Sequence, residues 1–172
     1  MKKIMLIAAL IAGAAGARAQ NKSDFEMVKS DNKDEVIYKG PLTFDDIREV
    51  KAFHLEKNAA RYDPNPQELA LLTDKLKEYQ LVVFLGTWCE DSHKLIPELY
   101  KVLTATNYPS DRQLQLYALD RSKKGREGEE QPYQITNVPT IILLKEGKEK
   151  GRITEIVEKS IEGDLLRIIE KE

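Results

Sequence analysis

The chain has 172 residues, of which 33% are charged and 41% are hydrophobic, with only 9 Gly and 7 Pro. These proportions exclude collagen-like, low-complexity and polytopic membrane proteins, and they suit one compact domain. Without its first 19 residues the chain has 24 basic and 29 acidic side chains, a net charge of −5, which argues against nucleic acid as the main partner.

The first 19 residues have the features of an export signal. Two lysines precede an apolar stretch, Ile4 to Gly16, that is too short to span a bilayer comfortably. The segment Ala17-Arg18-Ala19 places small residues at the positions that a signal peptidase requires, which predicts cleavage before Gln20. We therefore expect residues 1–19 to be a signal peptide. The mature protein should then be exported without stable membrane insertion, to the periplasm if the source is a bacterium with two membranes.

Residues 20–40 are predicted to be a flexible lead-in to a single domain over residues 41–172, because residues 20–34 are polar and charged. Residues 35–39 are interpreted as a short edge strand that Gly40-Pro41 ends. After a Thr43 N-cap, loosely helical spacing predicts one helix up to Asp63-Pro64, with these buried positions: Ile47, Val50, Leu55 and Ala59. A second helix has stronger signals, since Asn65 is a suitable N-cap, Pro66 suits the first helical position and Glu68 has the capping-box spacing.

The centre of the chain predicts a strand, a helix and a second strand. Residues 81–85 (LVVFL) are continuously apolar, which indicates a central strand buried on both faces. A helix follows over residues 90–106, and residues 114–119 form a strand parallel to the first if the crossover is right-handed. Residues 121–130 mix basic and acidic side chains, and we interpret them as a solvated loop and not as a binding patch.

The last third of the chain predicts a hairpin and a helix. A helical turn is expected over residues 131–135, and residues 140–144 form an apolar strand. Glu146-Gly147 suits a two-residue turn that leads into an antiparallel strand over residues 148–154. Ser160 is a suitable N-cap for a final amphipathic helix.

The single cysteine, Cys89, is the main candidate for chemistry. It cannot form an internal disulfide, and it lies directly after a buried strand and at the start of a helix. Backbone N–H groups and the helix dipole favour an anion at such a place, so the thiol would be activated as a nucleophile, and Trp88 would help to cover it. The alternative is that Cys89 is a small buried hydrophobic residue.

Several features of the sequence resemble the thioredoxin family. They are Trp88-Cys89-Glu90-Asp91-Ser92 after LVVFLGT, Pro97 eight residues past the cysteine, and Val138-Pro139-Thr140 before a strand–Gly–strand hairpin. The resemblance covers residues 81–169. It implies a thioredoxin-like fold of the α/β class, with a central mixed β-sheet flanked by helices, to which this chain adds a helical N-terminal segment. It also implies a cis peptide bond at Pro139, and substrate binding by Val138, Pro139 and Thr140 through strand-like pairing beside the cysteine.

Two departures from the family pattern define the chemistry. Ser92 stands where the C-x-x-C motif has its second cysteine, so a dithiol cycle within this chain is impossible. Val83 stands six residues before Cys89, where thioredoxins often carry a buried acid that helps to deprotonate that second thiol. Cys89 can still form a mixed disulfide that a thiol from another molecule releases. Ser92 is expected to donate a hydrogen bond to the thiolate, whereas Glu90 and Asp91 add negative charge beside it.

The sequence therefore predicts monothiol thiol–disulfide exchange at Cys89, with Ser92 and Trp88 as supporting catalytic residues and with protein or small-molecule thiols and disulfides as partners. No cofactor is expected. One alternative is a binding protein without turnover that holds extended or cysteine-containing clients beside Pro139. A weaker alternative is a copper-handling protein that uses Cys89 and His93, although one Cys and two His are few ligands for a closed site. No role is assigned to His54.

Overall fold

The computed structural model describes residues 23–30 and 35–171. The strands are β1 (Glu26–Lys29), β2 (Val36–Leu42), β3 (Gln80–Leu85), β4 (Leu114–Ala118), β5 (Thr140–Lys145) and β6 (Lys148–Thr154). The helices are α1 (Phe44–Glu49), α2 (Leu55–Ala59), α3 (Pro66–Lys75), α4 (Glu90–Ala105), α5 (Ser110–Gln113) and α6 (Ile161–Glu170). Three 3-10 turns are η1 (Lys51–Phe53), η2 (Leu76–Glu78) and η3 (Gln131–Tyr133).

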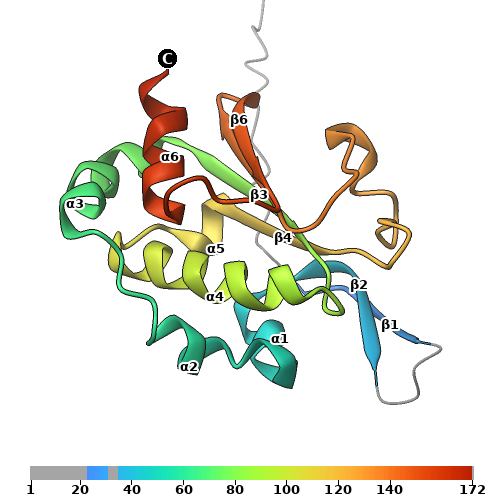
Figure 1. Ribbon diagram of the computed structural model, residues 1–172. Coiled ribbons are helices and arrows are strands. Elements are labelled where there is room, and N and C mark those ends of the chain that lie inside the picture. Colours follow the sequence, from blue (N-terminus) through green and yellow to red (C-terminus); the bar gives the residue numbers. More distant parts are fainter. Residues whose placement is uncertain (1–22, 31–34, 172) are drawn as a thin grey trace, which may run out of the picture.

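The described strands form one sheet in the order β1-β2-β4-β3-β5-β6. Strands β3 and β4 are parallel and the other neighbouring strands are antiparallel, so the sheet is mixed and mostly antiparallel. The helices lie along one side of the sheet, with α4 crossing its middle (Figure 1). This arrangement confirms the predicted α/β fold with a central mixed sheet. Within the described residues no helix combines the length and the apolar character needed to cross a bilayer.

Strand β3 is the centre of the core, as its apolar sequence predicts. Residues 81–85 are all buried, because their side chains alternate between two covered faces. Leu81, Val83 and Leu85 pack with apolar residues of α3, α4 and α6. Val82 and Phe84 belong to a smaller cluster on the opposite face, which the segment between β4 and β5 covers.

The helix ends follow most of the predicted caps. The Asn65 side chain accepts hydrogen bonds from the first turn of α3, and Ser160 accepts one from the N–H of Gly163 in α6. The predicted capping role of Glu68 is wrong, because the N–H of Asn65 donates to Glu162 and the Glu68 carboxylate accepts from Ser160. Glu68 therefore links α3 to the start of α6 rather than closing its own helix.

The hairpin between β5 and β6 forms as predicted. Glu146 and Gly147 have φ angles of 52° and 74°. Positive φ at both positions is what a type I′ two-residue turn requires. Strand β5 is therefore fixed between β3 and β6, with Pro139 at its entrance.

The single helix predicted after Thr43 and up to Asp63-Pro64 is wrong. The chain forms α1, η1 and α2 instead, with Val50 extended and His54 left-handed at a φ of 41°. The breaks let the chain wrap around α4, so that Ile47 and Phe53 are both fully buried. Tertiary packing overrides helical spacing here, because a straight helix presents only one face to the core.

The lead-in predicted over residues 20–40 is corrected where the structure describes it. Residues 26–29 and 36–39 pair as an antiparallel ribbon, and Phe25 stacks on Tyr38 with ring centroids 4.4 Å apart. Gly40-Pro41 does not end the second strand: with a φ of 110° at Gly40, β2 passes from pairing with β1 to pairing with β4. The predicted signal peptide, residues 1–19, lies outside the described residues.

A buried carboxylate fastens the helical layer together. The Glu162 side chain is 1% exposed and accepts hydrogen bonds from the N–H of Asn65 at 2.9 Å and from the hydroxyl of Tyr62 at 2.7 Å. Burial raises the pKa of Glu162, but these hydrogen bonds outweigh it and hold the pKa below its ordinary value of 4.5. The ionised form therefore stabilises the fold.

We predict that Glu162→Gln lowers the free energy of unfolding at pH 7 by about 1–3 kcal/mol, since a buried charged acceptor is lost. Because the pKa of Glu162 is lower in the folded than in the unfolded protein, its ionised form stabilises the fold at pH values above the unfolded pKa. This stabilisation is lost as the pH falls through the folded pKa. The deficit should therefore shrink below pH 4.5. Urea unfolding of both proteins at pH 7 and pH 3 measures it. The exposed change Glu170→Gln is the control, and an equal deficit at both pH values contradicts the prediction.

Candidate functional site

The site is built on the turn that joins β3 to α4, residues 86–89. Cys89 is the N-cap residue of α4, in an extended conformation, and its thiol is free and partly exposed. The sequence predicts this placement, and the structure confirms it. The thiol donates a hydrogen bond to the carbonyl of Val138 at 3.3 Å. Cys89 therefore lies between the start of a helix, which favours a thiolate, and the segment that precedes β5.

The Val138–Pro139 segment has the form that the resemblance implies. The peptide bond between the two residues is cis. Within the described residues the N–H of Val138 makes no hydrogen bond, and its carbonyl accepts only from the Cys89 thiol. An extended peptide could pair with these two groups in the way that a neighbouring strand would. Thr140 is buried, and its hydroxyl donates to the carbonyl of Asn137 at 2.8 Å, so this side chain supports the segment from within.

A second loop holds the Val138–Pro139 segment from the other side. The N–H of Glu155 donates to the carbonyl of Pro139 at 2.9 Å, and the Asn137 amide donates to the Glu155 carboxylate at 2.7 Å. Glu155 has a left-handed φ of 55°. Asn137 and Glu155 carry no sequence signal of this role, because their hydrogen bond joins two turns that are 18 residues apart in the chain.

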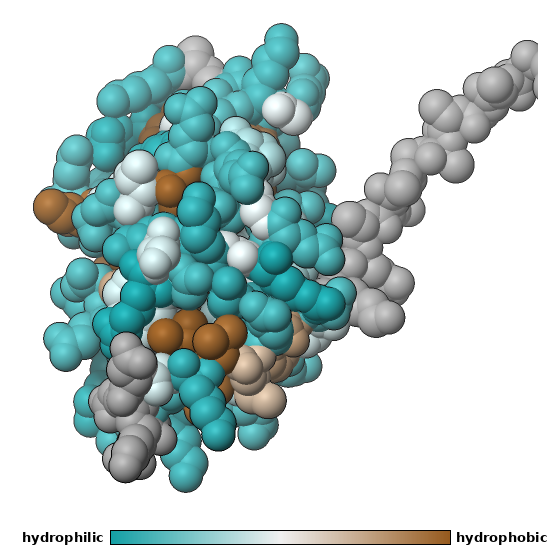
Figure 2. All heavy atoms as spheres, turned by 90° about the vertical axis from the view of Figure 1, so that its right-hand side faces the viewer, coloured by the Kyte–Doolittle hydropathy of each residue, from teal (hydrophilic) through white to brown (hydrophobic). Residues whose placement is uncertain are grey.

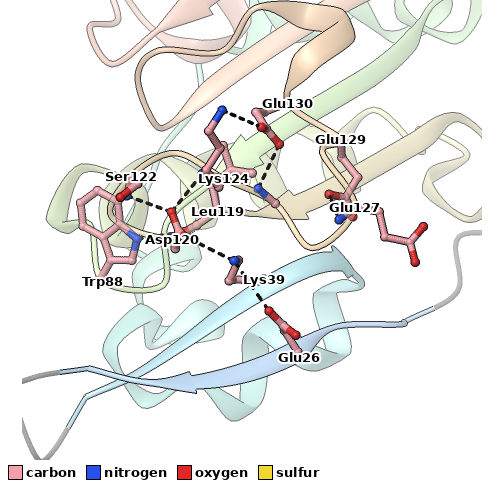
Figure 3. Close-up of polar contacts among 11 residues, drawn as sticks. Glu26, Lys39, Trp88, Leu119, Asp120, Ser122, Lys124, Glu127, Glu129 and Glu130 are labelled. Atoms are coloured by element: carbon pink, nitrogen blue, oxygen red, sulfur yellow. Dashed lines mark hydrogen bonds and ion pairs between the residues drawn. The ribbon is translucent and has the colours of Figure 1, made fainter.

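Trp88 is fixed in place by the segment after β4. Its indole N–H donates to the carbonyl of Leu119 at 2.9 Å, and both residues are drawn in Figure 3. The ring also lies beneath two cations. The Arg121 guanidinium carbon is 4.9 Å and the Lys123 ammonium is 5.3 Å from the ring centroid. Contacts of this kind attract a cation to an aromatic face. Trp88 therefore covers one side of the turn, as the sequence predicts, but with basic residues over it.

The charged run at residues 121–130 is a loop, as predicted, but several of its polar groups are anchored. Asp120 accepts hydrogen bonds from the N–H groups of Ser122 and Lys124, and it pairs with Lys39 of β2 at 3.1 Å (Figure 3). Glu130 is buried, where it accepts from the N–H of Gly125 and pairs with Lys124. The interpretation as a solvated loop is therefore wrong at Gly125 and Glu130, which are buried.

Ser92 has a different contact from the one predicted. It is fully buried, and its hydroxyl accepts a hydrogen bond from the N–H of Gly86 at 3.1 Å. No hydrogen bond joins Ser92 to Cys89 in the described part of the chain. The serine that replaces the family's second cysteine thus fastens the turn to the first coil of α4.

His93 and Thr87 also hold the turn. The Nε2 atom of His93 lies 2.8 Å from the carbonyl of Thr87, and because a carbonyl only accepts, this nitrogen carries the hydrogen. The ring packs edge-on against Phe53 with centroids 4.8 Å apart. Across the described residues no group of three or more His, Cys, Asp or Glu side chains is placed to hold a metal ion. The copper alternative therefore gains no geometric support.

The β1–β2 ribbon is attached directly to this turn. The Thr87 hydroxyl accepts from the N–H of Tyr38 at 3.1 Å and donates to the carbonyl of Val36 at 3.3 Å. Glu35 accepts two hydrogen bonds of 2.8 Å from Arg121, and this pairing lowers the pKa of the Glu35 carboxyl. Sequence reasoning missed these contacts. A single charged residue before a strand carries no signal of its partner.

A hollow lies beside the site between α2 and α4. It has a volume of about 380 Å³, and its walls include Glu90 and His93 of α4 as well as Arg61. Burial raises the pKa of Glu98, another wall residue. Cys89 is not part of the wall. The Cys89 sulfur contacts the carbonyl of Val138 instead.

Comparisons with known proteins agree with this geometry. The family model described as Thioredoxin matches residues 67–171. No match was found among curated proteins.

Solved structures with detectable similarity include a protein of unknown function from Pseudomonas aeruginosa, with 19% identity over 76% of this chain and 86% of that one and a TM-score of 0.45. The thioredoxin of Fasciola hepatica is 19% identical over 59% of this chain and 88% of its own, with a TM-score of 0.39. Mitochondrial thioredoxin 3 of Saccharomyces cerevisiae is 20% identical over 60% and 90%, with a TM-score of 0.38.

We predict that Ser92→Ala lowers the free energy of unfolding by about 1–3 kcal/mol, because the buried N–H of Gly86 loses its acceptor. Chemical unfolding monitored by circular dichroism measures the change. Ser122→Ala, at an exposed serine of the loop, is the matched control and should change stability by less than about 0.5 kcal/mol. Equal effects of the two substitutions would show that the Ser92 hydroxyl does not hold the turn.

Gly86→Ala should displace Trp88. A Cβ atom at Gly86 would lie 2.8 Å from an indole carbon and 3.1 Å from the Cβ of Cys89, so the ring or the cysteine must move. We expect a loss of stability of about 1–3 kcal/mol and a shifted tryptophan emission maximum. Because Trp88 is the only tryptophan, fluorescence reports on it alone. An unchanged spectrum would contradict the packing described here.

Proposed function

The chain belongs to the thioredoxin family, and we propose that it performs thiol–disulfide exchange with one sulfur, Cys89, while the second thiol comes from another molecule. The observation that carries the proposal is the position of the only cysteine. It caps α4, its thiol contacts the backbone of Val138, and Ser92 stands where a second cysteine would close a cycle. Protein or small-molecule disulfides are the proposed substrates.

The proposed reaction has two balanced steps. In the first, the Cys89 thiolate attacks one sulfur of a substrate disulfide, a new S–S bond forms, and the other substrate sulfur leaves with the electron pair. In the second, a thiolate from the substrate or from a small thiol attacks the mixed disulfide, and Cys89 leaves as a thiolate. If the attacking thiol belongs to the same substrate, the outcome is isomerisation. If it is a small thiol, the substrate sulfur becomes bonded to it, and reduction is complete when a second small thiol attacks this bond, forms the small-molecule disulfide and releases the substrate thiolate.

The surrounding contacts support positioning of both reactants. Val138 offers a free N–H beside the sulfur, so an extended substrate paired there would hold its disulfide against Cys89. Trp88 covers the turn on another side, with its indole bound to Leu119. The polar atoms of Ser92 and His93 are engaged in holding residues 86 and 87, which keeps the cysteine at the start of the helix.

The test uses a peptide that is joined through its cysteine to a chromogenic thiol. Wild-type protein without added thiol should release one equivalent of chromophore and stop, and addition of a small thiol should restart release. Cys89→Ala should lower the rate of chromophore release by more than about a hundredfold, to the background rate without protein.

Ser92→Cys is the informative second variant, because it restores a C-x-x-C pair and should allow the mixed disulfide to resolve without added thiol. A wild-type thiol that reacts only after unfolding would overturn the proposal. Mixed disulfides that persist in excess small thiol would favour the binding alternative, in which Cys89 holds clients without turnover.

Export is a further part of the proposal, and it rests on the signal-like residues 1–19. Expression of the full chain in a bacterium with two membranes should yield a periplasmic protein that begins at Gln20. N-terminal sequencing of the fractionated product measures this. Replacement of Ala17 and Ala19 by bulky residues should block cleavage, and a full-length cytosolic product of the wild-type chain would contradict the proposal.

A further inference from the structure

We propose that the β1–β2 ribbon, defined as the paired residues 26–29 and 36–39, is a second docking element for protein clients of Cys89. This inference rests on the proposed function. The ribbon lies outside residues 67–171, which match the family, so it is an addition to the family core. Its proposed occupant is an extended, non-native polypeptide with aliphatic side chains a few residues from its cysteine.

The exposed hydrophobic side chains are not spread evenly over the surface. Among the described residues five large ones are exposed, and three belong to the ribbon: Met27 at 66%, Val28 at 38% and Val36 at 47%. A fourth, Ile156 at 77%, follows the residue that binds Pro139. The fifth, Leu71, lies away on α3. Hydrophobic side chains gather on the lower part of the face that the ribbon occupies (Figure 2), and such gatherings mark interaction surfaces.

The ribbon is continuous with the cysteine site. The carbonyl of Val36 accepts a hydrogen bond from Thr87, which is two residues from Cys89. Glu35, directly before the same strand, binds Arg121, whose guanidinium lies over Trp88. A polypeptide paired with the Val138 segment can therefore run across the turn and onto the ribbon without leaving the protein surface.

Ion pairs hold three charged side chains at the ribbon, and three hydrophobic side chains are exposed beside them. Lys39 pairs with Asp120 at 3.1 Å and with Glu26 at 3.7 Å, and Glu35 pairs with Arg121, while Glu26 and Lys29 are themselves exposed. The aliphatic side chains remain outside. Exposed hydrophobic side chains at a sheet edge invite pairing with other chains, so their presence here favours an interaction surface.

The charges near the turn restrict the client further. Arg121 and Lys123 lie over the ring of Trp88, between the cysteine and the ribbon. Lys123 has no carboxylate partner in the described part of the chain. A client whose linking residues are neutral or acidic suits this strip, whereas a basic one would be repelled. Among the described strands β1 has only β2 as a neighbour, so its other edge can add an extended strand of the client.

The test compares rates of mixed-disulfide formation at Cys89. The probes are a peptide with leucines near its cysteine, a matched peptide with serines, a matched peptide with lysines in the linking positions, and a small aromatic disulfide. The variant Met27→Ser, Val28→Ser, Val36→Ser should slow the leucine peptide by about tenfold and leave the serine peptide and the small disulfide unchanged. Leu71→Ser, the matched control, should change none of them. The lysine peptide should react more slowly than the leucine peptide with the wild type.

The outcomes separate this inference from the proposed function. If the small disulfide does not react with Cys89 of the wild type, the proposed function fails. If it reacts, but the ribbon variant takes up the leucine peptide as fast as the wild type, only the ribbon inference fails.

Two further measurements test whether a second copy of the chain covers the ribbon and whether loss of folding explains a slower reaction. A wild-type dimer in sedimentation that the ribbon variant dissociates would also overturn the inference, since a second copy would then cover the patch. If the triple variant does not fold, the single exposed change Val36→Asp should slow the leucine peptide in the same way.

Discussion

The turn from Gly86 to Cys89 is held by hydrogen bonds from four parts of the fold, and the position of the cysteine depends on all of them. The first coil of α4 binds it through Ser92 and His93, and the β1–β2 ribbon binds it through Thr87. The carbonyl of Leu119, after β4, accepts a hydrogen bond from the Trp88 indole, and the carbonyl of Val138, before β5, accepts one from the Cys89 thiol. Because β3 is buried on both faces, the turn begins from a rigid strand end. The site is therefore a point where the sheet, the central helix and two long connections meet.

This arrangement explains why a serine suits the position of the family's second cysteine. Ser92 is fully buried under the turn, where an N–H group needs an acceptor, and a hydroxyl supplies one. Val83 lies in the apolar cluster on the helical side of β3, so no acid stands there to deprotonate a second thiol. The two departures are consistent with each other in space as well as in sequence. They leave one sulfur, so any disulfide that Cys89 forms must include a sulfur from another molecule.

The elements with strong local signals were predicted well from the sequence. Strand β3 and helices α3, α4 and α6 were predicted because apolar runs, caps and helical spacing act over a few residues. The region before α3 was not, for two reasons. Its apolar residues are buried because the short helices α1, η1 and α2 wrap around α4. The left-handed conformation of His54 breaks this region, and no spacing rule indicates it. Phe25, within a polar segment, is ordered by stacking on Tyr38, a contact that only the folded ribbon creates.

The sequence by itself determined that one cysteine follows a buried strand and begins a helix, because both features come from hydrophobic pattern and residue type within one short segment. It also determined that no second cysteine exists. The tertiary structure decided what surrounds that sulfur: the carbonyl of Val138, the structural use of Ser92, the cations over Trp88 and the attached ribbon. Most of these contacts join segments that are 31 to 51 residues apart in the chain. The Ser92 contact is local, but its partner is decided by the conformation of the turn. Such partners are chosen by the packing of the whole chain, which local pattern does not encode.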